Sequence, residues 1–469
     1  MVSVMWFRRD LRLEDNIALS QAFEKSEKLI LLFQVNPEQF LEDSMNHAAF
    51  FTSVLYLKNE IEKKGMHLQI LHGDIEESFQ KLKKDVPDWT DVYFNQDEKG
   101  YGKQRDDLMR TFFKENDISV HSYMDHYLHG AHEVHNNSGE LYKVFTPYYN
   151  KWIELDKPTP MKVEIDQSKV MKKVLYADNE EKLEKMVEEA GLDINYKPGT
   201  QAAKEQLKIF IEERLDDYKI GRDYPDEDKT SRLSQHMRLG ELSIRTLWAT
   251  VQAETSNESQ QTFLKELCWR DFYHMIYVAN PNQKEQPIKE QFSHIQWDND
   301  EEQFEKWIQG KTGYPIVDAA MRQLSTLGWM HNRLRMITAS FLTKDLLIDW
   351  RRGEKHFQKM LTDYDPCNNI GGWQWAASTG TDAVPYFRIF NPTTQSEKYD
   401  KSGDFIREFV PELKSVKNKY IHAPEKMSKE EQEACGVIIG ENYPAPIVNH
   451  STARKRAISI YEESKDIKQ

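Results

Sequence analysis

From Val2 to His121 the chain alternates short apolar runs with amphipathic stretches, and this alternation restricts the fold more than any other feature. Apolar runs typical of buried strands occupy residues 2–7, 29–35, 67–71, 91–94 and 118–121. Helical patterns lie between them at residues 48–64, 76–84 and 103–115. Strands that alternate with helices form a mostly parallel sheet covered by helices on both faces. The sequence therefore predicts a doubly wound α/β domain over residues 1–128.

The segment after the first predicted strand lacks a glycine-rich phosphate loop. Dinucleotide-binding domains place Gly-x-Gly-x-x-Gly there, because glycine lets the backbone approach a pyrophosphate. This chain has Arg8-Arg9-Asp10-Leu11-Arg12-Leu13 instead. An ordinary dinucleotide site is therefore not expected in this domain.

The pattern changes after residue 128. Residues 129–199 are charged and interrupted by prolines, with one helical pattern at 179–190, and are predicted to form an interdomain connector. From residue 200 to 469 helical periodicity dominates and strand signals are scarce. The chain of 469 residues is too long for one core. The prediction is therefore an α/β domain, a connector and an all-α domain over 200–469.

Charge and cysteine content restrict the class of protein. The net charge of −14 argues against a dedicated nucleic-acid binder. Residues 322–359 nevertheless contain eight Lys/Arg against three acids, and either a basic face or an ordinary solvated helix surface explains them, the latter being favoured. The three cysteines are far apart, so neither disulfides nor a cysteine-rich metal site is expected. No metal-ligand spacing and no membrane span is found, which predicts a metal-free cytoplasmic protein.

Tryptophan is concentrated in one part of the predicted helical domain. Seven of the eleven tryptophans lie between residues 269 and 375: Trp269, Trp297, Trp307, Trp329, Trp350, Trp373 and Trp375. A large aromatic core is the simplest explanation. Indoles can also relay electrons near a redox cofactor or stack on exposed nucleobases.

Polar residues interrupt the same helical region. Residues 328–336 are dense in polar groups, and Asp363, Asp365, Asn368 and Asn369 follow. Buried polar groups are costly unless they are satisfied, so a bound polar ligand and a structural hydrogen-bond network are equally good explanations. The run 230–234 (Thr-Ser-Arg-Leu-Ser) suits either phosphate oxygens or a helix cap, and the cap is favoured. Gly310-Lys311-Thr312 is not a P-loop, because Glu305 stands where the first glycine is required.

Several longer motifs resemble those of one family. They are Trp-Phe-Arg-Arg-Asp-Leu-Arg (6–12), Gly-Lys-Thr-Gly-Tyr-Pro (310–315), Asp-Ala-Ala-Met-Arg (318–322), Gly-Trp-Met-His-Asn-Arg-Leu-Arg-Met (328–336), Gly-Gly-Trp-Gln-Trp-Ala (371–376) and Tyr-Phe-Arg-Ile-Phe-Asn-Pro (386–392). Through them the chain resembles the photolyase/cryptochrome family over essentially its whole length, and within it the class I cyclobutane pyrimidine dimer DNA photolyases. The resemblance implies an N-terminal α/β antenna domain and a helical domain that binds FAD in a U shape.

The resemblance also assigns flavin contacts position by position. Arg335 and Asp363 resemble the ion pair beside the isoalloxazine ring, and Asn369 stands at the position near flavin N5. The full set of expected FAD-binding residues is Tyr218, Thr230, Ser231, Arg232, Leu233, Ser234, Phe263, Arg335, Asp363, Tyr364, Asp365 and Asn369.

Further positions resemble the catalytic and DNA-binding residues of the family. Trp373, Trp350 and Trp297 match a chain that photoreduces the flavin, and Glu266 matches the acid that stabilises the dimer radical anion. The expected contacts to a flipped-out lesion and its DNA are Arg222, Glu266, Trp269, Arg270, Asn332, Arg333, Met336, Trp375 and Arg388. The implied substrate is UV-damaged DNA, repaired by electron transfer from photoexcited reduced FAD.

Two other functions are alternatives: a cryptochrome-type photoreceptor, and a flavin-free nucleotide-binding protein built on the α/β domain, which would leave the Asp/Asn and Trp clusters of the helical domain unexplained. A cryptochrome-type photoreceptor would keep the fold without repair, but Met336 and the complete lesion pocket resemble the cyclobutane-specific enzymes. The family also implies an antenna pigment, methenyltetrahydrofolate or a deazaflavin. Gly102 stands where folate-binding relatives carry glutamate, and Lys284 and Glu285 both lie near the expected lysine, so the residues do not choose between the pigments. A monomer without a protein partner is expected.

Overall fold

The computed structural model describes residues 2–39, 41, 43–190 and 196–466. Residues 191–195, which belong to the predicted connector, lie outside this description. Contacts group the chain into two compact units. Unit 1 comprises Met1–Tyr142, Thr146–Asp216 and Ser231–Pro281; unit 2 comprises Lys143–Phe145, Asp217–Thr230 and Asn282–Gln469. The division at residues 128 and 199 stays a prediction.

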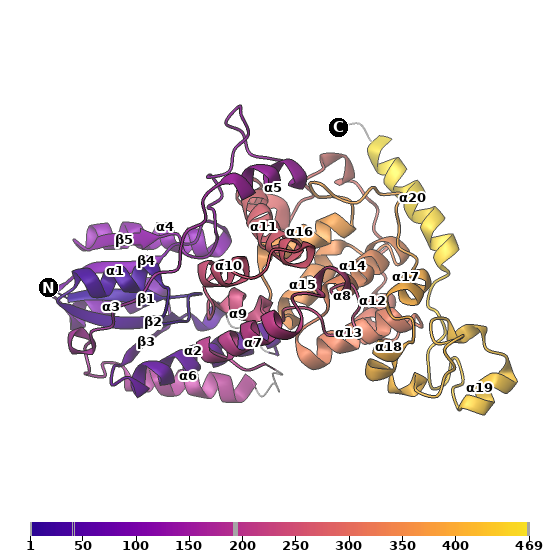
Figure 1. The fold of residues 1–469 in the computed structure, drawn as a ribbon, viewed down its shortest axis with the longest axis horizontal. Coiled ribbons are helices and arrows are strands. Elements are labelled where there is room, and N and C mark those ends of the chain that lie inside the picture. The colour runs from indigo at the N-terminus through magenta and orange to yellow at the C-terminus, as the bar shows by residue number, and fades with distance from the viewer. Residues whose placement is uncertain (1, 40, 42, 191–195, 467–469) are drawn as a thin grey trace. The chain divides into compact units, whose positions relative to one another are not determined.

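A five-stranded parallel sheet forms the core of unit 1 (Figure 1). The strands are β1 (Val2–Phe7), β2 (Lys28–Val35), β3 (Leu68–His72), β4 (Trp89–Asn95) and β5 (Ser119–Tyr123), in the order β3-β2-β1-β4-β5. Successive side chains of β1 enter opposite cores: Met5 and Phe7 join one cluster, and Val4 and Trp6 join the other. Because both faces are buried, each strand reads as an apolar run. The predicted doubly wound α/β fold is confirmed.

Helices of unit 1 follow the predicted alternation with one omission. They are α1 (Ile17–Lys25), α2 (Met45–Lys63), α3 (Ile75–Asp85), α4 (Gly100–Glu115), α6 (Ala177–Ala190), α7 (Thr200–Glu213), α9 (Ser234–Leu239), α10 (Ile244–Gln252) and α11 (Glu258–Ala279), while α5 (Phe145–Glu154) begins at the unit boundary. The helix α1 was not predicted, although Ala18, Leu19, Ala22 and Phe23 are buried along one face of its nine residues. Within the described part of the connector there are two α-helices, α5 and α6, rather than the single one expected.

The opening motif of the chain has a structural use in unit 1. The Arg8 guanidinium lies 2.5 Å from Asp106 on α4, and Arg12 pairs with Asp125 after β5. Asp10 accepts the Arg8 backbone N–H at 2.7 Å and the Asn95 amide at 2.6 Å. These buried pairs tie the carboxyl end of β1 to those of β4 and β5, the edge where a dinucleotide loop would otherwise lie.

Unit 2 is helical throughout its described part. Its helices are α8 (Tyr218–Gly221), α12 (Glu301–Ile308), α13 (Pro315–Leu327), α14 (Asn332–Ser340), α15 (Trp350–Met360), α16 (Pro366–Ala376), α17 (Pro392–Tyr399), α18 (Asp404–Phe409), α19 (Lys429–Cys435) and α20 (His450–Asp466), with a π-helical turn at Phe341–Asp345. The predicted all-α character is confirmed. None of the described helices combines the length and apolar character that a membrane span needs.

The motif that resembled a P-loop is bound by a nearby side chain of the protein, that of Asp318. Asp318, which is fully buried, accepts Thr312 N at 2.7 Å, Thr312 Oγ1 at 2.6 Å and Gly313 N at 3.1 Å. Tyr443 completes the set by donating its hydroxyl at 2.7 Å. Gly313 has φ +77°, and a Cβ there would meet the backbone of Ala445 at 2.5 Å. The motif therefore holds a late segment of the chain against α13.

Candidate functional site

The predicted flavin-ring pair is formed within unit 2. Arg335 on α14 donates Nη2 to Asp363 Oδ2 at 2.8 Å and Nε to the Met330 carbonyl at 2.8 Å. Asp363 is 8 % exposed, and its other oxygen, Oδ1, is buried without a hydrogen bond from any described residue. An unsatisfied buried acceptor is costly, so Oδ1 is available to accept a hydrogen bond from a ligand.

A buried glutamate links the next two predicted residues. Glu354 on α15 accepts the Tyr364 hydroxyl at 2.8 Å and the Asn369 amide Nδ2 at 3.2 Å, both on Oε1. Glu354 is 2 % exposed, and its burial raises the pKa of its carboxyl against these two bonds. Because Nδ2 of Asn369 is committed to Glu354, the amide oxygen is left to accept from another group. Sequence analysis missed Glu354, which lies in a charged run that reads as helix surface.

Helix α16 carries the predicted residues Asn369, Trp373 and Trp375, and Asp365 precedes it as the N-cap. Asp365 caps its first turn by accepting Cys367 N at 3.0 Å and Asn368 N at 3.2 Å. Trp373 is 2 % exposed, whereas Trp375, two residues further on the helix, is only half-buried. A Cβ at Gly353 of α15 would lie 2.1 Å from the Trp373 ring, so only glycine permits this packing.

The three tryptophans of the predicted electron chain all lie in unit 2. Trp350 begins α15 and is buried, while Trp297 is half-buried and its ring contacts Tyr461 at 6.2 Å. Trp373 contacts Trp307 at 6.1 Å between ring centroids. Across the described ranges no recorded ring contact joins Trp297, Trp350 and Trp373 to one another, so their function as a chain stays a prediction.

Helix α14 gathers three predicted lesion contacts. Asn332, Arg333 and Met336 fall at positions i, i+1 and i+4, and Arg333 Nη1 lies 3.9 Å from Met336 Sδ. Arg333 is also paired with Asp223 at 2.6 Å and stacks over Tyr399. Its charge is thus partly neutralised within the protein.

The remaining predicted residues of unit 2 are more scattered. Tyr218 on α8 is buried beneath Arg222, whose guanidinium lies 5.7 Å from the ring centroid. Thr230 is half-buried at the end of the same segment, and Arg388 is exposed in the loop before α17.

In unit 1, helix α11 presents the other predicted lesion residues. Glu266 and Trp269 are half-buried on it, and the Trp269 ring stacks near Tyr273 at 5.5 Å. Arg270 lies 4.5 Å over Tyr127 and donates to the His126 carbonyl, so this side chain is engaged with the protein. Phe263 is buried against Phe210 at 4.6 Å.

The predicted cap at residues 230–234 is wrong. Helix α9 begins at Ser234, and Leu233 occupies the N-cap position without a side-chain cap. Ser231 Oγ accepts the Leu233 backbone N–H at 3.4 Å, which is not a bond to the first turn of α9. Arg232 has φ +55°, a left-handed conformation that is uncommon for a non-glycine residue and costs energy. The phosphate-contact alternative for this segment stays a prediction.

The basic stretch 322–359 is largely neutralised by ion pairs. Arg322 pairs with Glu412, Arg333 with Asp223, Arg335 with Asp363, Arg351 with Asp349 and Arg352 with Glu301, while Lys344 is buried. Its excess of positive charge therefore does not form one free basic face.

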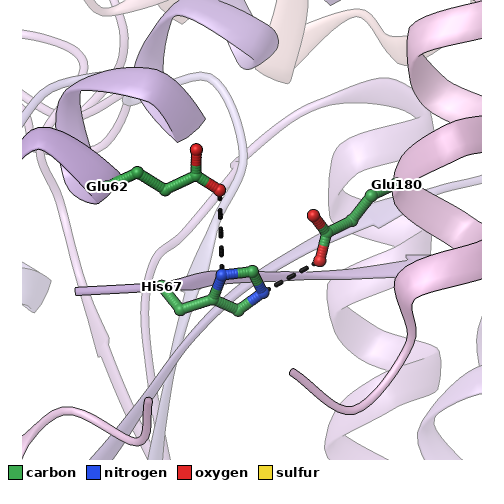
Figure 2. Close-up of side chains that lie close together, drawn as sticks. All are labelled: Glu62, His67 and Glu180. Atoms are coloured by element: carbon green, nitrogen blue, oxygen red, sulfur yellow. Dashed lines mark hydrogen bonds and ion pairs between the residues drawn. The ribbon is translucent and has the colours of Figure 1, made fainter. Parts of the chain in front are cut away.

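One cluster of described residues presents three groups of the kind that bind metals. Figure 2 shows His67 between Glu62 and Glu180, with Nδ1 3.7 Å from Glu62 and Nε2 2.9 Å from Glu180. The two ring nitrogens point in different directions, so the carboxylates face separate nitrogens rather than one common point. Lys58 Nζ bridges the same carboxylates, at 2.9 Å from Glu62 and 3.3 Å from Glu180. The arrangement is that of an ion cluster joining α2, the start of β3 and α6.

Comparison with known proteins assigns both parts of the chain. Residues 3–164 match the family model described as DNA photolyase, and residues 263–463 match that described as FAD binding domain of DNA photolyase. A protein named deoxyribodipyrimidine photo-lyase from Alkalihalophilus pseudofirmus is 44 % identical over 98 % of both chains.

Solved structures agree with these matches. The class III photolyase of Agrobacterium tumefaciens aligns with a TM-score of 0.91 and 35 % identity over 99 % of this chain and 97 % of that one. The Sulfolobus tokodaii photolyase, described as holding two FAD molecules, aligns with a TM-score of 0.84 and 32 % identity over 99 % of this chain and all of that one.

Proposed function

The chain belongs to the DNA photolyase family, with bacterial relatives, and from this premise we propose that it repairs cyclobutane pyrimidine dimers in DNA under light. Its relatives at up to 44 % identity are named deoxyribodipyrimidine photo-lyase, which favours repair over the cryptochrome alternative. Bound FAD, once reduced and excited by light, supplies the electron that opens the dimer.

The observation that carries this proposal is the half-satisfied Asp363. Its Oδ2 is bonded to Arg335, whereas Oδ1 is buried with no donor from the described residues. An isoalloxazine ring carries an N–H group that could donate to Oδ1. Glu354 accepts the Asn369 amide N–H, which leaves the Asn369 amide oxygen to accept a hydrogen bond from the ring. Arg335, Asp363 and Asn369 would thus hold the ring of FAD.

The roles of the remaining residues follow from the chemistry of the substrate. Trp269 and Trp375 would stack on a dimer extruded from the duplex, with Asn332 and Met336 beside it. Glu266, when it carries a proton, would donate a hydrogen bond to the dimer as negative charge develops there, which lowers the barrier more than it strengthens ground-state binding. Arg222, Arg333 and Arg388 would contact the DNA backbone.

Repair of a defined dimer-containing oligonucleotide under blue light, with a dark control, tests this function. We expect repair only in the illuminated sample. A purified protein without flavin absorbance, or one that binds flavin but never restores the oligonucleotide, would refute the proposal.

Two variants separate the assigned roles. Trp373→Phe should block photoreduction of oxidised flavin while chemically reduced enzyme still repairs.

Glu266→Ala should lower the repair yield far more than the affinity for the dimer. Unchanged yield with weaker binding would make Glu266 a positioning residue.

We further propose a second, light-harvesting chromophore, as in the Sulfolobus relative. The candidates remain methenyltetrahydrofolate and a deazaflavin, and the absorbance of pigment extracted from the protein distinguishes them. We also propose a monomer in the cytoplasm, where three free cysteines stay reduced. Sedimentation of the purified protein tests the monomer.

A further inference from the structure

A buried carboxylate lies on the helix that carries the unit 1 part of the proposed lesion site. Asp271 of α11 is 1 % exposed. Its Oδ2 accepts the backbone N–H of His129 at 3.0 Å and the indole N–H of Trp152 at 3.0 Å. Its Oδ1 is buried and receives no hydrogen bond from the described residues. Both donors come from the connector, so one side chain joins α11 to two separate connector segments.

Neighbouring side chains on the same face of α11 also contact residues outside the helix. His274, fully buried, stacks on Tyr127 at 3.7 Å and binds Glu98 through Nε2 at 2.7 Å. Arg270 also contacts Tyr127. Positions 270, 271 and 274 fall on one side of the helix, whereas Trp269 is two residues from Asp271 and therefore points to the opposite side.

The surroundings of Asp271 do not favour its ionised form. Burial raises the pKa of its carboxyl to about 6, against the opposing effects of Arg270 and the bonds from Trp152 and His129. The groups around it are Arg270 and Cys268 on its own helix and His129, Tyr148, Trp152 and Lys157 in the connector. A carboxylate that costs stability at neutral pH is expected where it has another use.

We propose that Asp271 is a positioning residue, which fixes the rotation of α11 on the connector and so aims Glu266 and Trp269 at the dimer. This inference rests on the proposed function. Asp271 itself touches neither DNA nor the reacting atoms in this assignment. Its hydrogen bonds act through the backbone of α11.

Three variants and a matched control test this role. Asp271→Leu removes both bonds, Trp152→Phe removes only the indole donor, and Asp271→Asn keeps an acceptor oxygen for both. Asp318→Leu is the control, because Asp318 is equally buried but lies in unit 2 on a structural motif. The measurements are dissociation constants for dimer-containing and undamaged DNA, and hydrogen exchange of residues 263–273.

We expect Asp271→Leu to weaken binding of damaged DNA about tenfold, the value of one lost base stack, and to leave undamaged DNA unchanged. Trp152→Phe should give a smaller loss in the same direction, and Asp271→Asn should restore discrimination. Exchange over 263–273 should rise in Asp271→Leu but not in Asp318→Leu.

Two results would overturn the inference: equal discrimination in the Asp271→Leu and Asp318→Leu variants, or unchanged exchange of α11 when both bonds are lost. If Asp271→Leu does not fold, Trp152→Phe supplies the same comparison. Wild-type protein without preference for dimer DNA would refute the proposed function instead, and the exchange measurement would still decide whether Asp271 holds α11.

Discussion

Asp318 and Asp363 are both buried carboxylates of unit 2, yet their hydrogen bonding differs. Asp318 receives four hydrogen bonds from the chain itself, two on each oxygen. Asp363 is bonded to Arg335 through one oxygen, and the other has no donor among the described residues. The difference teaches that a motif whose polar atoms are all satisfied is architectural, whereas a half-satisfied one is prepared for a ligand.

The largest expected effect tests the ligand-binding side of this comparison. Asp363→Asn removes the charge that faces Arg335 and the acceptor oxygen left for the flavin, and should weaken FAD binding by about 3 kcal/mol, the upper value for a hydrogen bond to a charged group. The Arg335 side chain is 25 % exposed, so its unpaired charge stays partly hydrated and the folded protein loses less stability. The measurement is FAD titration of flavin-free protein, followed by fluorescence. Asp318→Asn is the control, and its folded fraction should keep normal FAD affinity. Equal FAD affinities in the two variants would break the comparison.

The architectural side predicts a loss of stability instead. Asp318→Asn replaces an acceptor oxygen by an NH₂ group, so two of its four donors lose their partner. Unfolding free energy should fall by about 3 kcal/mol, at about 1–3 kcal/mol for each buried unsatisfied group. Urea unfolding of the flavin-free protein measures it, with Asp363→Asn showing the smaller loss. A stability change below that of Asp363→Asn would contradict the structural role of Asp318.

Asp271 sharpens the comparison, because it is half-satisfied like Asp363 but in unit 1. Its folded pKa of about 6 lies above the ordinary 3.8. The folded state therefore holds this proton more tightly than the unfolded state, and wild-type stability is lost as pH rises from about 4 through 6. Asp271→Asn lacks this proton, so its stability relative to wild type should rise by about 2 to 3 kcal/mol between pH 4 and pH 7. A pH-independent difference would show that Asp271 is already compensated.

The smallest expected effect concerns Arg388, an exposed cation, in contrast to the buried carboxylates above. Arg388 has no recorded ion pair within the described ranges. Arg388→Ala should weaken damaged and undamaged DNA alike, and reduce the slope of log affinity against log salt by about 0.9, the value of one phosphate contact. Arg333→Ala should change the slope less, because Asp223 already neutralises part of its charge. Selective loss for damaged DNA in the Arg388 variant would place Arg388 in the lesion pocket.

Most of the fold could be predicted from sequence, because parallel strands buried on both faces leave apolar runs that require no knowledge of partners. The helix α1 was missed because its apolar pattern, though helical in spacing, is only nine residues long. The 230–234 cap was wrong because the apolar Leu233, rather than one of the neighbouring hydroxyl residues, occupies the N-cap position of α9. Glu354 and Asp271 could not be found either. Glu354 is one acid in a charged run, whereas Asp271 stands among aromatic and apolar residues. In both cases only the three-dimensional contacts reveal which groups the buried carboxylate binds. The site residues taken from family resemblance remain predictions for the experiments above.

The bond between Tyr443 and Asp318 also has a consequence for how the protein is made. The donor follows the acceptor by 125 positions in the chain. At translation rates of about 5–20 residues per second, Asp318 waits roughly 6 to 25 s on the ribosome before its last donor has even been synthesised. During that time the carboxylate of Asp318, in the first turn of α13, is one hydrogen bond short of its final set, since only the donors of Thr312 and Gly313 have been synthesised. Nascent helices of unit 2 are therefore expected to depend on chaperones longer than the α/β unit, whose sheet is complete by residue 123.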